Sequence, residues 1–393
     1  MRYKFKDGYV LTEEEPLGSG ANFVSYRGIL INDTFPNGKN VVLKEYIPTK
    51  NLINKRYKTI NKCIDIRMNN SEIISNEKEI YCKEIMVADK EMFLRQFKTL
   101  PLIVNNIKKL QNNELIRDDI VDYYSDDFQL FDEKLKPIEN LDMTDYESVR
   151  NVKYYRGLSI YYDDNFSPDG ILSDVSEIED ILSILIEISE IISRLHKEKL
   201  FHRDIKINNF LYKKRNDTFI VKMLDTDSIT DQIKSICSSE PYSPIEAYRG
   251  EYYYQSDIYM LGVTLFKMIL GKDSDLFTHY SNDERTGEQH KYIIYEDLFS
   301  QQNIHLLIEK YHCTRGFLNR LSKIFNKSLA NAYRNRYDSV EKFVEDLKVL
   351  LDIYHHKGVH PEVMLDSAIE MAEGPNFLKE YDEKLLCDIE EVK

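Results

Sequence analysis

Between residues 201 and 211 the chain reads FHRDIKINNFL, and this stretch decides how the rest of the sequence is interpreted. Before it, apolar residues recur at steps of three and four over residues 178–195, which predicts a long helix ending near His196. After it, residues 219–224 form a short apolar run that predicts a strand. The polar side chains of the quoted stretch therefore fall in a loop between two apolar segments.

The two halves of the chain differ in their secondary-structure signals. β-Branched and aromatic residues separated by turn-forming residues predict an antiparallel meander, with strands at 9–11, 23–30 and 41–46. The stretches 49–90 and 105–155 are ambiguous, while residues 91–100 favour a helix and residues 152–162 favour a strand. Helical spacing returns at 258–270, 317–329 and 339–352. The β-rich half followed by an α-rich half indicates an α+β protein.

The stretch 201–211 resembles the catalytic loop of the Ser/Thr protein kinases, and further motifs of that family occur in the expected order. The resemblance covers roughly residues 9–351 and looks like a bacterial branch of these kinases. It implies a two-lobed fold, in which a small antiparallel sheet with one main helix precedes a larger helical lobe. On this basis the lobes span residues 1–164 and 165–352, and residues 353–393 form an acidic helical extension.

Four residues of the larger lobe match positions that carry the chemistry of the family. The resemblance implies that Asp204 accepts the proton of the substrate hydroxyl, and that Lys206 offsets the charge on the transferred phosphoryl group. It also implies that Asn209 and Asp225 hold Mg²⁺ on the nucleotide phosphates. The expected reaction is transfer of a phosphoryl group from ATP to a Ser or Thr hydroxyl of a protein.

Residues near the N-terminus match the positions that hold ATP in the family. Gly18, Ser19 and Gly20 lie between two predicted strands, where glycines let the backbone approach phosphate groups closely. Lys44 stands on the next predicted strand and resembles the lysine that grips the α- and β-phosphates. Alone, these two motifs are weak, since such a turn and a solvated strand lysine are common in other proteins.

The acidic partner of Lys44 is the least defined part of the resemblance. In the family this lysine pairs with a glutamate on the following helix. Here the alignment of that helix places Gln96 at the pairing position, and Glu91 or Glu84 serves instead if the register differs. The sequence leaves these three possibilities open. A glutamine could hydrogen-bond the lysine but would not neutralise it.

Two further motifs match the architecture of the larger lobe. Residues 241–246 resemble the end of the activation segment, and residues 257–262 resemble the start of the central helix. In the family the glutamate at the end of the activation segment is held by an arginine near the end of the domain. The resemblance therefore implies a buried ion pair between Glu246 and Arg336.

Departures from the family pattern support a second hypothesis, a pseudokinase that acts as a binding or scaffold module. Thr226 and Asp227 replace the Phe and Gly of the family's Asp-Phe-Gly triplet, so its apolar plug and flexible glycine are missing. Phe23 replaces the third glycine of the phosphate loop, and Gln96 stands at the glutamate position. The retained catalytic and metal-binding residues favour the active enzyme.

A third hypothesis is a small-molecule phosphotransferase related to the aminoglycoside phosphotransferases. These enzymes share a two-lobed plan and a similar set of Asp and Asn residues. Lys206, Glu246 and the segment 257–262 point away from this reading, because they belong to the peptide-binding architecture of the protein kinases.

Composition limits the partners and the location. The 393 residues contain 53 Lys and Arg against 67 Asp and Glu, and the net charge of −14 argues against nucleic-acid binding. The five cysteines are scattered singly, which favours reduced thiols over disulfides or a zinc site. No stretch reads as a membrane span or signal peptide, so a cytoplasmic location is expected. The sequence gives no indication of the oligomeric state.

Overall fold

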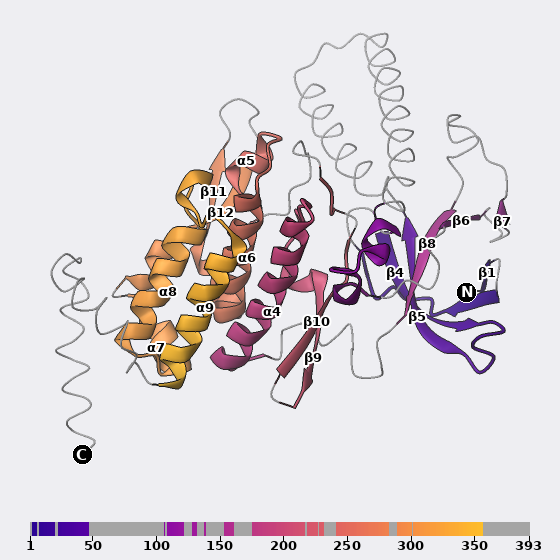
Figure 1. Cartoon of the computed structure of the whole chain (residues 1–393), viewed down its shortest axis with the longest axis horizontal. Coiled ribbons are helices and arrows are strands. Elements are labelled where there is room, and N and C mark those ends of the chain that lie inside the picture. Colours follow the sequence, from indigo (N-terminus) through magenta and orange to yellow (C-terminus); the bar gives the residue numbers. More distant parts are fainter. Residues whose placement is uncertain are drawn as a thin grey trace, which may run out of the picture. The chain divides into compact units, whose positions relative to one another are not determined.

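The structure is a computed structural model, and the residues that it describes form two compact units, Met1–Phe166 and Ser167–Lys393 (Figure 1). The described residues are 2–5, 8–19, 23–46, 106, 108–121, 128–131, 137–138, 153–160, 175–216, 218–226, 228–231, 241–282, 289–300 and 302–356. The predicted helix at 91–100, the stretch 49–90 and nearly all of the extension 353–393 lie outside them.

The first unit is built on one antiparallel sheet. Its strands are β1 (Arg2–Phe5), β2 (Gly8–Thr12), β3 (Gly18–Ser19), β4 (Phe23–Ile31), β5 (Lys39–Tyr46), β6 (Phe128–Phe131), β7 (Pro137–Ile138) and β8 (Lys153–Ile160). They follow the order β1-β2-β4-β5-β8-β6-β7, and β3 pairs with β4. The predicted strands at 9–11, 23–30, 41–46 and 152–162 are confirmed as β2, β4, β5 and β8. A short 3₁₀ helix spans Arg117–Asp119.

Alternation along the strands separates the two faces of this sheet. Tyr3, Val10, Leu30 and Val41 are buried together on one face. Leu11 pairs with Ile29 across β2 and β4, and both side chains are exposed. Successive side chains of a strand point to opposite faces, so one face forms the core of the unit.

The second unit is mainly helical. Its α-helices are α4 (Ile178–Lys197), α5 (Ile245–Tyr248), α6 (Tyr254–Leu270), α7 (His305–Tyr311), α8 (Arg315–Ser328) and α9 (Val340–His355). Its strands form two hairpins, β9 (Phe210–Arg215) with β10 (Thr218–Met223) and β11 (Thr278–Asn282) with β12 (Gln289–Ile293). Its 3₁₀ helices are η2 (Ile207–Asn209), η3 (Gly271–Phe277), η4 (Tyr295–Phe299) and η5 (Tyr333–Asn335). The predicted helices are confirmed as α4, α6, α8 and α9, and the strand at 219–224 as β10.

Helix α6 lies at the centre of this unit, and most of its side chains are buried. It packs against α4 and α8, while α9 packs against α4 and α8 (Figure 1). At Gly262 a Cβ atom would lie 2.5 Å from the Oγ atom of Ser328, so only glycine permits this approach of α6 to α8. Helix α6 begins earlier than its apolar pattern predicts, because the Ser256 side chain accepts a hydrogen bond from the Tyr253 N–H at 3.1 Å.

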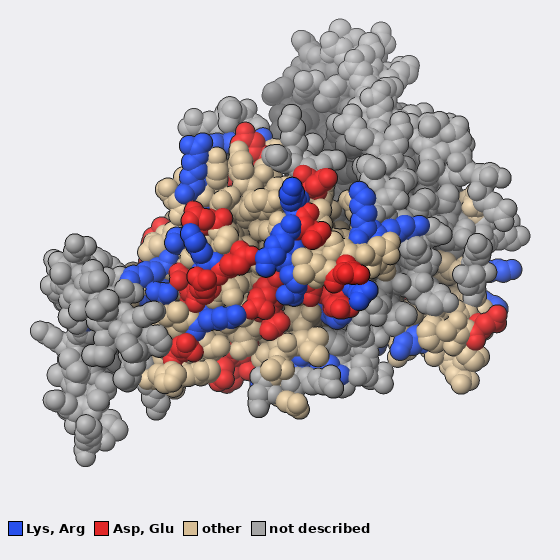
Figure 2. Space-filling model, in the orientation of Figure 1, with Lys and Arg blue, Asp and Glu red and all other residues tan. Residues whose placement is uncertain are grey.

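Charged side chains of both signs are interspersed over the face of the second unit that Figure 2 shows. No helix within the described ranges is long and apolar enough to cross a membrane.

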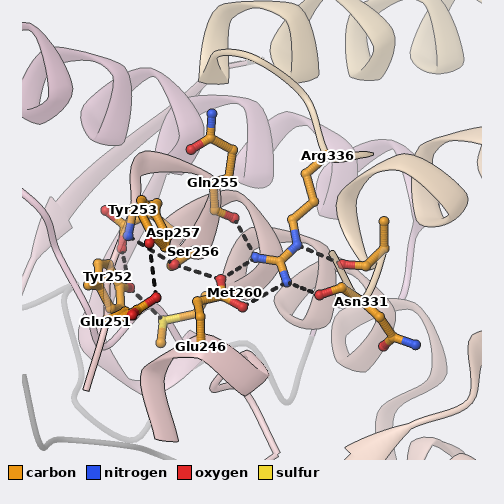
Figure 3. Close-up of polar contacts among 11 residues, drawn as sticks. Glu246, Glu251, Tyr252, Tyr253, Gln255, Ser256, Asp257, Met260, Asn331 and Arg336 are labelled. Atoms are coloured by element: carbon orange, nitrogen blue, oxygen red, sulfur yellow. Dashed lines mark hydrogen bonds and ion pairs between the residues drawn. The ribbon is translucent and has the colours of Figure 1, made fainter. Parts of the chain in front are cut away.

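A buried ion pair joins α5 to the loop before α9 (Figure 3). The guanidinium of Arg336 donates to both carboxylate oxygens of Glu246, at 2.5 and 3.2 Å, and Ser256 Oγ donates to the same carboxylate at 2.7 Å. Arg336 also donates to the backbone oxygens of Ala330, Asn331 and Gln255. The predicted pair between Glu246 and Arg336 is confirmed. The carboxylate accepts hydrogen bonds from Arg336 and Ser256, and the guanidinium also donates to backbone oxygens.

Removing Arg336 should therefore destabilise the protein strongly. We expect Arg336→Ala to lower the free energy of unfolding by about 3–5 kcal/mol, because it leaves the Glu246 carboxylate buried without its cation. The matched control is Arg334→Ala, because Arg334 is exposed and should matter by no more than about 0.5 kcal/mol. Urea unfolding of the two variants measures the difference. Equal stability of both would contradict this role of the ion pair.

Candidate active site

The loop between α4 and β9 is held by the buried carboxylate of Asp257, which lies in the first turn of α6. Its Oδ2 atom accepts from the His202 backbone N–H and from His196 Nε2, both at 2.9 Å. Its Oδ1 atom accepts from the Arg203 backbone N–H at 2.9 Å and from the Tyr252 hydroxyl at 2.7 Å. Asp257 is 0% exposed, so these donors replace its hydration shell.

These contacts keep the carboxylate charged and the loop bent. Burial alone would raise the pKa of Asp257, but the hydrogen bonds from His196 and Tyr252 and the charge of His196 outweigh it, and the pKa lies below its ordinary value. Arg203 has a φ of 69°, a left-handed conformation that is unfavourable for a residue with a side chain. The hydrogen bond from its own N–H to Asp257 helps to fix this conformation. The sharp bend then directs the residues that follow.

Asp204, Lys206 and Asn209 meet directly after this bend. The Nζ atom of Lys206 lies 2.7 Å from Oδ2 of Asp204. The side-chain amide of Asn209 donates to the same Oδ2 at 2.8 Å and to the backbone oxygen of Asp204 at 2.7 Å. Because both bonds use Nδ2, the amide is oriented with Oδ1 as its acceptor on the other side. The structure thus brings together three of the predicted site residues.

Asp225 lies close to the same loop. The Leu224 N–H donates to the backbone oxygen of Asn209 at 2.8 Å, which places the residue before Asp225 against the loop. His202 is also near enough to Asp225, Asp204 and Asp257 for all three carboxylates to raise its pKa. The two residues predicted to bind Mg²⁺, Asn209 and Asp225, are therefore neighbours in the folded chain.

His202 is held neutral in spite of these carboxylates. Its side chain is fully buried, and desolvation lowers its pKa below the ordinary value of 6.5 more than the three acids raise it. Its ring stands beside that of Phe210, with the centroids 5.4 Å apart. A neutral imidazole adds no positive charge to the site, whereas the ammonium group of Lys206 contacts Asp204 directly.

Tyr242, at the end of the predicted activation segment, lies in the neighbourhood of Asp204. Burial and the charge of Asp204 together raise the pKa of Tyr242 to about 12. A phenol with this pKa is neutral at physiological pH. The segment 241–246 therefore passes close to the aspartate that is predicted to accept the hydroxyl proton.

The other predicted site residues belong to the sheet of the first unit. Ser25 of β4 pairs with Gly18 of β3 on one side and with Lys44 of β5 on the other. Lys44 is only 6% exposed, so it is not the ordinary solvated lysine of a surface strand. Gly18 and Ser19 form the short strand β3, and Gly20 lies outside the described residues.

Gln96, Glu91, Glu84 and Asp227 lie outside the described residues, so the partner of Lys44 stays a prediction. Thr226 is described and is completely buried.

The donor chemistry fits a magnesium nucleotide better than a metal cage made by the protein alone. Among the described residues, no group of three or more His, Cys, Asp or Glu could hold a metal ion. An amide oxygen and a carboxylate are suitable Mg²⁺ ligands, and Mg²⁺ commonly binds through one or two protein groups plus water and phosphate oxygens. Asn209 and Asp225, the pair predicted to bind Mg²⁺, have side chains of these two kinds.

The sequence did not reveal the role of Asp257. Its position directly before the apolar stretch of α6 is a signal, since a buried carboxylate requires hydrogen-bond donors. Those donors are two backbone N–H groups and the side chains of His196 and Tyr252. Backbone donors leave no mark on the sequence, so the partner of Asp257 could not be inferred from it.

Comparison with known proteins gives matches to kinases. Residues 163–345 match the family model described as protein kinase domain, a range that includes Asp204, Asn209 and Asp225 but not Lys44 or Gly18. A probable serine/threonine-protein kinase of Clostridium perfringens is 27% identical over 173 residues, covering 42% of this chain and 23% of the relative. The probable serine/threonine-protein kinase PknB of Lactococcus lactis is 25% identical over 219 residues, covering 54% and 32%. The chain thus spans at most about a third of the length of these two relatives.

A solved structure is also similar. The crystal structure of Rad53 residues 1–466 in complex with AMP-PNP matches with a TM-score of 0.47 and 14% identity, covering 86% of this chain and 64% of that one.

The contacts of Asp257 predict the effect of replacing it. In Asp257→Asn the amide offers one acceptor oxygen where the carboxylate offered two, and its NH₂ group faces a donor. We expect a loss of about 1–3 kcal/mol in the free energy of unfolding for each buried donor left without an acceptor. Asp352→Asn, at an exposed position of α9, is the control and should change little. Thermal or urea unfolding decides, and equal stability of both variants would refute the role of Asp257.

Burial of neutral His202 predicts a pH dependence. Below about pH 6.5 the unfolded chain binds a proton at this residue and the folded chain does not, so the free energy of unfolding falls as the pH is lowered. The contribution approaches about 1.4 kcal/mol per pH unit. Urea unfolding between pH 7 and pH 5 should show a shallower slope in His202→Gln than in the wild type. An identical slope would mean that His202 titrates normally in the folded protein.

Proposed function

We propose that this chain, whose residues 163–345 form a domain of the protein kinase family related to bacterial serine/threonine kinases, transfers the γ-phosphoryl group of ATP to Ser or Thr hydroxyls of proteins. The observation that carries the proposal is the contact between Asp204, Lys206 and Asn209 on a loop that also adjoins Asp225. Autophosphorylation is part of the proposal, because the chain contains many Ser and Thr residues.

Each residue of the loop has a role that follows from its contacts. Asp204 accepts the proton of the attacking hydroxyl, and its carboxylate is oriented by Lys206 and Asn209. Lys206 is close enough to Asp204 to place positive charge beside the phosphoryl group during transfer. Asn209 Oδ1 and the carboxylate of Asp225 would hold Mg²⁺, which when bound supplies positive charge to the phosphate oxygens.

The first unit would bind the nucleotide. In the proposal, Lys44 orients the α- and β-phosphates of ATP, and the backbone of Gly18, Ser19 and Gly20 covers the phosphates. The pairing of Ser25 with both β3 and β5 supports this, because it places Gly18 and Lys44 on neighbouring positions of one sheet. Lys44 is also buried, as expected for a lysine that interacts with specific groups and not with bulk water.

Protein substrates would pass along the segment 241–246. Tyr242 is close enough to Asp204 for the charge of Asp204 to raise the pKa of Tyr242. Glu246, at the end of the segment, is held by Arg336. A peptide whose hydroxyl reaches Asp204 would therefore contact a segment that is fixed at Glu246. We also propose a cytoplasmic location and no nucleic-acid partner, on the basis of the singly scattered cysteines and the net charge of −14.

The proposal predicts that transfer depends on Asp204. With ATP, Mg²⁺ and a generic basic protein, Asp204→Asn should lower the transfer rate at least about a hundredfold, because the hydroxyl loses its proton acceptor. The control Asp338→Asn alters an exposed aspartate that forms an ion pair with Lys342, and it should keep the wild-type rate. Transfer of ³²P to protein is the measurement.

The alternatives give different results in the same assay. Equal rates in the wild type and Asp204→Asn would refute the assignment of Asp204. Stabilisation by nucleotide without any transfer would indicate a pseudokinase. Transfer to small alcohols and not to proteins would indicate a small-molecule phosphotransferase.

A further inference from the structure

Hydrogen bonds of Ser228 and Thr230 attach the segment after Asp225 to residues 201 and 202 of the predicted catalytic loop. The Ser228 hydroxyl donates to the backbone oxygen of His202 at 2.6 Å. The Phe201 N–H donates to the Thr230 oxygen at 2.8 Å, and the Thr230 N–H returns to the Phe201 oxygen at 3.1 Å. These two backbone bonds form an isolated antiparallel bridge. Ser228 adds a side-chain contact between the two segments.

Hydrogen bonds therefore hold the chain on both sides of Asp225. Before it, the Leu224 N–H donates to the Asn209 oxygen at 2.8 Å. After it, the bonds of Ser228 and Thr230 hold the chain to residues 201 and 202. Asp225 could change its orientation only if the hydrogen bonds before it or those after it were broken.

The peptide groups around His202 join this segment to Asp257. The His202 N–H donates to Asp257, and the His202 carbonyl accepts from Ser228. The peptide groups of His202 therefore take part in two bonds. One fixes the predicted catalytic loop to Asp257, and the other fixes the segment that contains Asp225 to that loop. The positions of Asp204 and Asp225 are both set relative to the same buried carboxylate.

Apolar burial accompanies these bonds. Ile229 is 1% exposed, and Thr226 is completely buried, although it is much smaller than the aromatic residue of the family's triplet. The Ile229 N–H donates to the Thr226 oxygen at 3.3 Å, which closes a turn between them. The segment is therefore packed and bonded without an aromatic plug at position 226.

We infer that Ser228 is a positioning residue that holds the segment carrying Asp225 against the catalytic loop, in place of the apolar plug and glycine that Thr226 and Asp227 replace. Its consequence for phosphoryl transfer rests on the proposed function. The segment would then stay in one arrangement, with Asp225 beside Asn209, whether or not nucleotide is bound.

Amide hydrogen exchange tests whether the hydrogen bond of Ser228 holds the segment, and it requires no phosphoryl-transfer activity. Ser228→Ala should increase the exchange rate of the amides of residues 224–230 by about two- to tenfold, as expected for the loss of one hydrogen bond. Ser228→Thr keeps the hydroxyl and should restore slow exchange. Ser189→Ala is the matched control, because it removes a hydroxyl bond to a backbone oxygen of the same kind, 2.7 Å long, within α4. It should leave residues 224–230 unchanged.

A second readout concerns the metal ion. In Ser228→Ala the Mg²⁺ concentration for half-maximal phosphoryl transfer should rise by about two- to tenfold, and Ser228→Thr should return it to the wild-type value. Unchanged exchange at 224–230 in Ser228→Ala would overturn the inference, and so would faster exchange that Ser228→Thr does not reverse. If the wild type transfers no phosphate, the proposed function fails, and the exchange rates still decide whether Ser228 holds the segment.

Discussion

The arrangement of the candidate site depends on one buried carboxylate, that of Asp257. A charge removed from water is stable only when donors surround it, and here the donors come from the catalytic loop, α4 and the segment before α6. The loop is consequently fixed at His202 and Arg203, including the left-handed backbone of Arg203. The side chains of Asp204, Lys206 and Asn209 start from this fixed bend and need little further ordering to meet one another.

The first turn of α6 links two parts of the second unit. Ser256 donates to Glu246, whose carboxylate is held by Arg336, while its neighbour Asp257 accepts from the catalytic loop. Figure 3 shows both carboxylates beside this turn. The end of the activation segment and the catalytic loop are therefore attached to consecutive residues of one helix. In the proposed function, substrate binding and proton acceptance share this support.

Sequence patterns predicted much of the fold and part of the site for physical reasons. The strands β2, β4 and β5 and the helix α4 have strong apolar periodicity, and the family motifs predicted the pair of Glu246 with Arg336. The same motifs pointed to Asp204, Asn209 and Asp225, whose roles stay predictions. The hairpin of β11 and β12 was missed because it has no such periodicity. The contacts of Asp257 and Ser228 were missed because their partners include backbone groups, which the identity of a residue does not specify.

The most direct test of this account is a crystal structure with Mn²⁺ in place of Mg²⁺ and with AMP-PNP. The account predicts an anomalous Mn²⁺ peak bound by Asn209 Oδ1 and the Asp225 carboxylate at about 2.0–2.3 Å, with the γ-phosphate facing Asp204 and the loop still bonded to Asp257. A nucleotide bound away from these residues, or Mn²⁺ with no contact to Asn209 and Asp225, would contradict it.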